Sequence, residues 1–279
     1  MKTIRIIAVA LALGTSAISA HAGNVLIVLS DSGHLDLKNG KDFKTGFYLN
    51  ELMQPVEALI EAGHDITFST PTGKAPTLDK SSVDKMYFGG DEAAMQKSIA
   101  MLDQLKLTSD SASPVISLAR VEQIGYDHFD AVYVPGGHAP MQDLLVSRDL
   151  GKLLTDFHSK GKTTALACHG PIALLSALPD ATTVTAQLEK GGSPKAGNWI
   201  YAGYKMTVIS NQEEEIAKGL LNGGEMKFYP QTALEAAGGV YVSDETPWSP
   251  KVVTDRELIT GQNPGSASAV AAELLQRLR

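Results

Sequence analysis

The sequence contains only one cysteine, Cys168, among 279 residues. A single cysteine cannot form an internal disulfide, so its thiol serves either as a small buried side chain or for its chemistry. Basic residues are also scarce, with 24 Lys and Arg against 31 Asp and Glu, and they form no run. The resulting net charge of -7 argues against binding nucleic acid through its phosphates.

Histidine is absent after His169. Triad-type amidotransferases and papain-like proteases carry a histidine downstream of their cysteine, so neither arrangement is available here. G-x-S-x-G, H-E-x-x-H and P-loop motifs are missing as well. His34 and Asp36 could offer two metal ligands, but a solvent-exposed loop is the favoured interpretation, and we expect no metal and no organic cofactor.

Long apolar runs are lacking beyond the first residues of the chain. Lys2 and Arg5 precede a short apolar stretch, and Ser19-Ala20-His21-Ala22 has the small-residue pattern of a cleavage site. We expect residues 1–22 to be a signal peptide and residues 23–279 to be the mature domain. The product would be exported, periplasmic if the host is Gram-negative, and free of the membrane once the signal is removed.

The rest of the chain alternates between strand and helix patterns. Residues 24–30 and 65–70 resemble buried parallel strands, and a helix predicted at 46–62 connects them in a right-handed β-α-β unit. Further elements are predicted at 92–105, 130–134, 163–167, 205–209, 239–243, 251–254 and 265–278, and 79–125 can form a cap or insertion. The prediction is a single α/β domain with a doubly wound, mostly parallel, flavodoxin-like sheet, helices on both faces and ligands at the carboxyl ends of the strands.

Cys168 directly follows the predicted strand at 163–167 and precedes a helical stretch at 170–177. The small neighbours Ala167 and Gly170 suit the tight, strained turn of a nucleophile elbow. Free backbone N–H groups and the helix dipole at such a turn would favour the thiolate. We therefore predict that Cys168 is a nucleophile.

Polar groups near the same sheet edge are candidates for assisting this thiol. His169 can exchange protons or polarise a carbonyl group, although adjacent side chains on a regular helix diverge. The backbone N–H groups of Gly136, Gly137 and Gly170 can bind substrate oxygen, and His138 lies beside them in the sequence. Each glycine could also serve only an ordinary turn.

Glu51 lies among apolar residues of the predicted helix at 46–62, at the same sheet end as Cys168. A carboxyl group in such surroundings would have a raised pKa and could act as an acid or a base. A solvated position on the helix surface is the alternative that the sequence leaves open.

Several of these motifs match one family. Ala167-Cys168-His169-Gly170-Pro171 resembles the Cys-His elbow of the ThiJ/PfpI superfamily, which has a class I glutamine amidotransferase-like fold. Val134-Pro135-Gly136-Gly137-His138 resembles its strand-end glycine motif, and the segment from Gly46 to Pro55 resembles its first helix. Residues 260–266, TGQNPGS, resemble the carboxyl-terminal signature of its chaperone/glyoxalase III branch.

The resemblance implies roles for individual residues. It implies that Glu51 places a carboxyl group beside the nucleophile Cys168, and that Glu214 pairs with His169, with Glu213 as the competing register. It also implies a homodimer and a small carbonyl substrate. The sequence departs from the branch at Ala139, where a glycine is more common, and in its expected export.

The leading hypothesis from the resemblance is a glutathione-independent glyoxalase that converts methylglyoxal to lactate, a glyoxalase III-like lyase of the D-lactate dehydratase type, acting in stress defence. The alternatives are a holdase-type chaperone or stress protein, which would need a large exposed apolar patch, and a small amidase- or peptidase-like hydrolase. A redox sensor that oxidises Cys168 is a further possibility.

Overall fold

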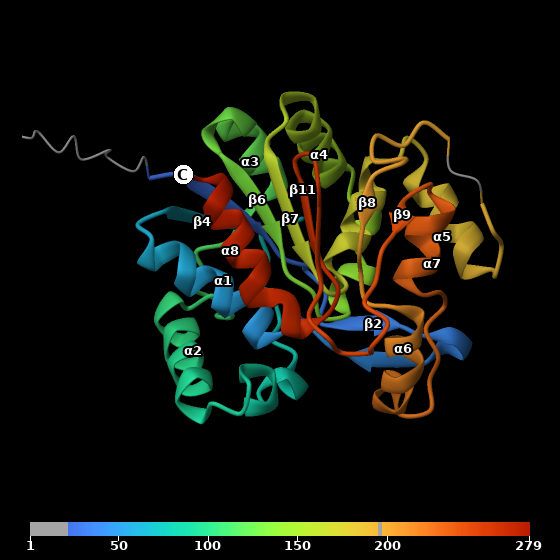
Figure 1. The fold of residues 1–279 in the computed structure, drawn as a ribbon, viewed down its shortest axis with the longest axis horizontal. Coiled ribbons are helices and arrows are strands. Elements are labelled where there is room, and N and C mark those ends of the chain that lie inside the picture. The colour runs from blue at the N-terminus through green and yellow to red at the C-terminus, as the bar shows by residue number, and fades with distance from the viewer. Residues whose placement is uncertain (1–21, 195–196) are drawn as a thin grey trace, which may run out of the picture.

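The structure is a computed structural model that describes residues 22–194 and 197–279. Apart from Ala22, the predicted signal peptide lies outside these residues. Within the described part of the chain, no helix has both the length and the apolar character needed to span a bilayer. A seven-stranded sheet forms the centre of the fold (Figure 1).

The strands follow the order β10-β11-β7-β6-β1-β4-β5, and every neighbouring pair is parallel except β10 with β11. Their bounds are β1 Asn24–Val28, β4 Asp65–Thr70, β5 Ile116–Ser117, β6 Ala131–Val134, β7 Thr163–Ala167, β10 Val252–Asp255 and β11 Leu258–Gly261. Two small sheets lie outside this one: β2 (His34–Asp36) with β3 (Asp42–Lys44), and β8 (Lys205–Met206) with β9 (Val240–Tyr241).

Helices cover both faces of the sheet (Figure 1). On one face α1 (Leu49–Glu61) and α8 (Ala267–Arg277) pack together, with α2 (Glu92–Leu105) outside α1; the other face carries α3 (Leu118–Ile124) and α4 (Arg148–Lys160). Alternate residues of β1 serve the two cores: Leu26 packs with the α4 side and Ile27 with the α1 side. This confirms the predicted doubly wound, mostly parallel α/β domain. The remaining helices are α5 (Ala181–Glu189), α6 (Asn211–Ala217) and α7 (Pro230–Ala236).

Several element bounds differ from the prediction, and one strand was not predicted. Helix α1 begins at Leu49 rather than at residue 46, because Phe47 stays extended and exchanges backbone hydrogen bonds with Thr77 and Asp79. The strand predicted at 205–209 shortens to β8, outside the main sheet. The place beside β7 is instead taken by β11, which the sequence patterns did not single out.

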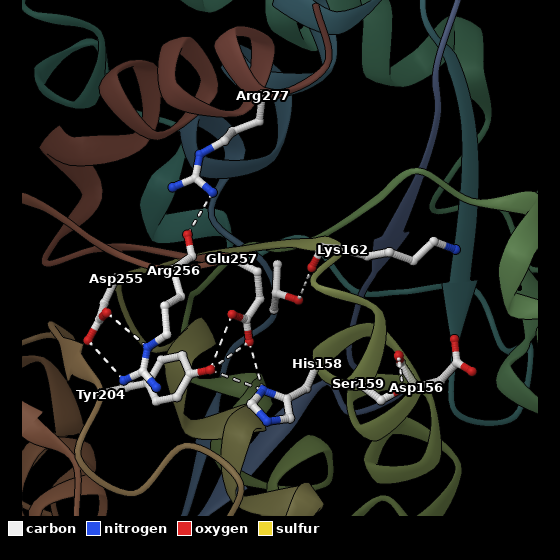
Figure 2. Close-up of polar contacts among 10 residues, drawn as sticks. Asp156, His158, Ser159, Lys162, Tyr204, Asp255, Arg256, Glu257 and Arg277 are labelled. Carbon is white, nitrogen blue, oxygen red and sulfur yellow. Dashed lines mark hydrogen bonds and ion pairs between the residues drawn. The ribbon is translucent and has the colours of Figure 1, made fainter.

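A polar cluster closes the sheet end opposite to Cys168, where β7 and β11 begin (Figure 2). Glu257 accepts hydrogen bonds from the Tyr204 hydroxyl at 3.1 and 3.2 Å and lies 2.8 Å from His158 Nδ1. The Arg256 guanidinium stacks on the Tyr204 ring, 3.3 Å from its centroid, and the Arg277 side chain donates to the Arg256 carbonyl. The cluster thereby joins the end of α4, the approach to β8 and the start of β11.

We expect Tyr204→Phe to destabilise the protein by about 1–3 kcal/mol, because it leaves a buried carboxylate short of donors. The melting temperature should fall by about 2–4 °C per kcal/mol in a domain of this size. Tyr229→Phe is the matched control, since Tyr229 donates to Glu215 in an exposed pair and its loss should change little. Equal melting temperatures for the two variants would contradict a stabilising role for this cluster.

Candidate active site

The predicted site residues gather where parallel strands end. Strand β6 ends just before Pro135-Gly136-Gly137, and β7 ends just before Cys168. Because β6 and β7 are paired in parallel, these two turns lie side by side at the carboxyl edge of the sheet. Glu51 reaches the same edge from the first turn of α1.

Cys168 occupies a strained turn. Its φ is 56°, in the left-handed region that β-carbons disfavour, and two backbone hydrogen bonds hold it, from its own N–H to Gly261 and from Ile209 N–H to its carbonyl. A β-carbon at Gly170 would lie 2.4 Å from the Val134 carbonyl oxygen, so only glycine fits there. The geometry matches the tight turn between small residues that the sequence predicted.

The thiol is buried, with 2% of Cys168 exposed. Burial is the main cause that raises the pKa of Cys168 well above its usual range, and the nearby carboxyl groups of Glu51 and Glu214 add to it. This reverses the expectation of a resting thiolate. The segment after the elbow is a 3-10 helix, η7 (Gly170–Ala177). The partial positive charge at its start favours the thiolate less than burial and the two nearby carboxyl groups disfavour it. A base must therefore remove the thiol proton before any attack.

His169 lies in position to be that base. Its Nδ1 is 3.3 Å from Cys168 Sγ, and its Nε2 is 2.8 Å from Glu214 Oε1. The neighbouring Cys and His side chains can meet because Cys168 is left-handed and the two residues form a turn instead of a regular helix. The three side chains make a buried thiol–imidazole–carboxylate chain.

Glu213 has a different environment from Glu214. Its carboxylate accepts hydrogen bonds from the N–H and hydroxyl of Ser210, from the side-chain amides of Gln262 and Asn263, and from the Trp248 N–H. Five donors explain how a fully buried carboxylate is accommodated. They also fix the start of α6, and with it the place of the next residue, Glu214.

Glu51 lies on the other side of the thiol. Its carboxyl group is next to the Cys168 side chain, and its Oε2 accepts a hydrogen bond of 2.8 Å from the Gly136 N–H. Burial raises the pKa of Glu51 to about 8, despite the opposing effects of those two contacts. Below about pH 8 this side chain is therefore a neutral acid. Its complete burial excludes the solvated position that the sequence left open.

The glycine turn serves the site in two ways. The Gly136 N–H holds Glu51 and so is not free for a substrate oxygen, contrary to the sequence expectation. A β-carbon at Gly136 would lie 2.6 Å from Glu51 Oε2 and 2.7 Å from the backbone nitrogen of His169, which excludes any larger residue. The N–H groups of Gly137 and Gly170 have no acceptor among the described residues, so they remain available for substrate oxygen.

His138 packs against His169, with ring centroids 4.1 Å apart, and against the edge of Phe43. Burial, together with the nearby His169, holds the pKa of His138 well below its usual range, so its imidazole is neutral. Its Nε2 is 3.9 Å from Glu214 Oε2. His138 is therefore part of the buried polar cluster around Glu214.

Tyr48 and Tyr87 were not predicted as site residues. Their rings meet edge to face with centroids 5.3 Å apart. Burial raises the pKa of both hydroxyls, and the charge of Cys168 contributes to both shifts, which places the two rings near the thiol. Tyr87 belongs to the 3-10 helix η3 (Lys85–Phe88), so part of the region predicted as a cap does border the site.

The chain resembles a family of known proteins over a range that includes this site. A family model described as ThiJ/PfpI family-like matches residues 43–220, more than half of the chain. The chain belongs to this family. The ThiJ/PfpI match covers Glu51, the glycine turn, the Cys168 elbow and Glu214.

The alignments with individual relatives cover most of the chain. Glyoxalase 3 of Candida albicans is 26% identical over 253 residues, covering 90% of this chain and 96% of the relative. The glutathione-independent glyoxalase HSP31 of Saccharomyces cerevisiae is 22% identical over 255 residues, covering 91% and 98%. The protein/nucleic acid deglycase HchA of Staphylococcus aureus is 28% identical over 244 residues, covering 86% and 74%.

The fold is also that of a solved structure. The crystal structure of glyoxalase III from Candida albicans superposes with a TM-score of 0.68 at 24% identity, covering 93% of this chain and 98% of the other. Glyoxalase or deglycase activity is therefore the function for which relatives in this family are named, whereas the reaction of this chain depends on its own site.

Proposed function

We propose that the protein converts 2-oxoaldehydes such as methylglyoxal into 2-hydroxy acids without glutathione, using Cys168 as the nucleophile. One observation carries the proposal: a single buried thiol lies between two different proton-transfer groups, the His169–Glu214 pair and the neutral acid Glu51. An isomerisation of this kind needs both, one to generate the thiolate and one to move a proton between two carbons.

The first step would form a carbon–sulfur bond. His169 takes the thiol proton, and Glu214 balances the charge of the imidazolium. The thiolate attacks the aldehyde carbon, and the resulting alkoxide takes the proton of Glu51 to give a hemithioacetal. The N–H groups of Gly137 and Gly170 would stabilise oxygen charge during this step.

The second step would use Glu51 again, now as the carboxylate. It removes the hydrogen from the former aldehyde carbon, and the imidazolium of His169 protonates the ketone oxygen to give an enediol. Glu51 then delivers its proton to the second carbon and regains one from the first hydroxyl, which leaves a thioester. Water hydrolyses the thioester with His169 as base, releasing the 2-hydroxy acid and the Cys168 thiol.

The test is methylglyoxal turnover by the purified protein without glutathione, followed as lactate. We expect lactate to accumulate, and in deuterium oxide we expect deuterium at its second carbon, because the transferred hydrogen passes through an exchangeable carboxyl group. Lactate without deuterium would point to a hydride shift and contradict the role of Glu51. Absence of both lactate formation and methylglyoxal loss would contradict the proposed reaction.

A second candidate, hydrolysis of a small amide or removal of a carbonyl adduct from an amine, is favoured by the Cys168–His169–Glu214 chain. That arrangement suits acyl transfer even though no histidine follows His169, because His169 itself contacts the thiol. The relative named as a deglycase is consistent with this chemistry. Release of free amine from a methylglyoxal-treated arginine or lysine derivative, at a rate comparable to lactate formation, would support it.

The neighbouring acids Glu213 and Glu214 should respond differently to the same substitution. Glu214→Gln should lower kcat/KM by about 10²–10⁴-fold with little change in melting temperature, because a neutral amide cannot balance the imidazolium. Glu213→Gln should destabilise the protein by about 3 kcal/mol, because an amide cannot accept from all five donors. Measuring melting temperature and turnover for both variants separates the roles; a large catalytic loss in a Glu213→Gln protein of unchanged stability would contradict this assignment.

A further inference from the structure

We propose that His138, His169 and Glu214 form a binding site for a divalent transition metal, Zn²⁺ in particular, and that a metal bound there switches off Cys168. The metal is an inhibitor in this proposal and not a cofactor. Metal binding itself does not depend on which reaction the protein performs. The loss of activity rests on the proposed function, in which His169 serves the thiol.

The spacing of the three side chains suits a zinc ion. One ligand atom from each lies within 4.8 Å of the others. Glu214 Oε1 is 2.8 Å from His169 Nε2, and Glu214 Oε2 is 3.9 Å from His138 Nε2. Tetrahedral zinc with bonds of about 2.0–2.2 Å holds its ligand atoms about 3.3 Å apart, within the span of these two distances. Small side-chain rotations would therefore complete the site.

His138 supplies an independent reason to expect a ligand. The residue is only 4% exposed, and its Nδ1 has no hydrogen-bond partner within residues 22–194 and 197–279. Its Nε2 faces Glu214 across a gap that is too long for a hydrogen bond. Nδ1 lies across the ring from Nε2, so the ligand atom is Nε2, which faces the carboxylate and makes no hydrogen bond to a described residue that a metal would have to break.

The donor set selects among metals. Two imidazoles and one carboxylate suit Zn²⁺, with one coordination position left for water or another small ligand. Mg²⁺ and Ca²⁺ require more oxygen ligands than these residues provide. The three residues come from different elements, after β6, after β7 and on α6, whose positions the hydrogen bonds of Glu213 and of the Cys168 backbone help to fix.

The thiol lies outside the proposed coordination sphere. Cys168 Sγ contacts Nδ1 of His169, whereas Glu214 contacts Nε2 on the opposite side of the ring. A metal at Nε2 requires the neutral imidazole to carry its proton on Nδ1, so the proton between His169 and Glu214 is replaced by one on the nitrogen that faces the thiol. His169 can then no longer accept the thiol proton, and turnover stops although Cys168 is untouched.

The experiment titrates the purified, metal-free protein with ZnCl₂ by calorimetry and records the visible absorption of added Co²⁺. We expect one saturable site and a Co²⁺ spectrum typical of tetrahedral coordination. His138→Ala should weaken binding by at least about tenfold, since loss of even an outer partner of a metal ligand costs about 10–100-fold. Cys168→Ala should bind Zn²⁺ as the wild type does.

His34→Ala is the matched control, because His34 lies 3.3 Å from Asp36 in an exposed histidine–carboxylate pair that has no third ligand in the described part of the chain. It should retain both binding and activity. Binding lost in Cys168→Ala but kept in His138→Ala would place the metal on the thiol and overturn the proposal, as would the absence of a saturable site. Binding that depends on His138 without any effect on turnover would retain the site and overturn its inhibitory role, independently of whether methylglyoxal is the substrate.

Discussion

Cys168→Ala is expected to lower kcat/KM for methylglyoxal by at least about 10³-fold, because no other group can form the covalent intermediate. Cys168 is the only cysteine of the chain, so no second thiol can substitute. Cys168→Ser should be equally inactive, since the hydroxyl is a far weaker nucleophile than the thiol under the same base. The measurement is lactate formation without glutathione at saturating and limiting substrate.

Stability must be followed in the same variants. The side chain is buried at a left-handed backbone position, and the shift to alanine removes one sulfur atom without relieving that conformation. A modest change in melting temperature is therefore expected, which separates lost chemistry from lost folding. Turnover by folded Cys168→Ala within about tenfold of the wild type would rule out the covalent mechanism.

Glu51→Gln should produce two effects of opposite sign. Activity should fall by about 10²–10⁴-fold, because the amide can neither accept nor deliver the migrating proton. The protein should become more stable by about 3 kcal/mol at pH 7, because the wild-type carboxyl is held protonated to about pH 8 and an unfolded one ionises near 4.5. Thermal unfolding and lactate formation measure the two effects on one preparation.

The pH dependence gives a second check on Glu51. Its pKa is higher in the folded state, so its favourable contribution is complete below about pH 4.5 and is lost as the pH rises towards about 8. The stability difference between Glu51→Gln and the wild type should grow over that window. Glu57→Gln, on the same helix but bonded to Ser98 on α2, should show neither this trend nor the catalytic loss. A difference independent of pH would contradict the raised pKa.

The sheet could be predicted where a strand is a continuous apolar run flanked by turn residues. Strands β4 and β7 and helix α2 have the predicted bounds. Strand β11 was not predicted, because Leu258–Gly261 is four residues long and follows β10 after only Arg256 and Glu257. Its place in the central sheet depends on pairing with β7, nearly a hundred residues earlier, which no local pattern reveals.

The site residues likewise divide into those that a local motif reveals and those that only tertiary packing brings together. The adjacent pair Cys168 and His169 was visible as a motif, whereas the contact of Tyr87 with the site depends on how the segment before α2 packs. The choice between Glu213 and Glu214 has a local signal in the sequence. Ser210 followed three residues later by Glu213 is a capping box, and the structure contains both of its hydrogen bonds. Assigning Glu213 to the cap would have left Glu214 for His169.

The location of Tyr87 has a consequence for how substrate range can change. The groups that would perform the chemistry are held by strand ends and by glycines that tolerate no side chain, whereas Tyr87 belongs to η3, which packs against α2. Tyr87 can therefore be replaced without changing the groups that would perform the chemistry. For the proposed reaction, we expect substitutions within residues 84–90 to change which carbonyl compounds are accepted while Cys168, His169 and Glu51 stay in place.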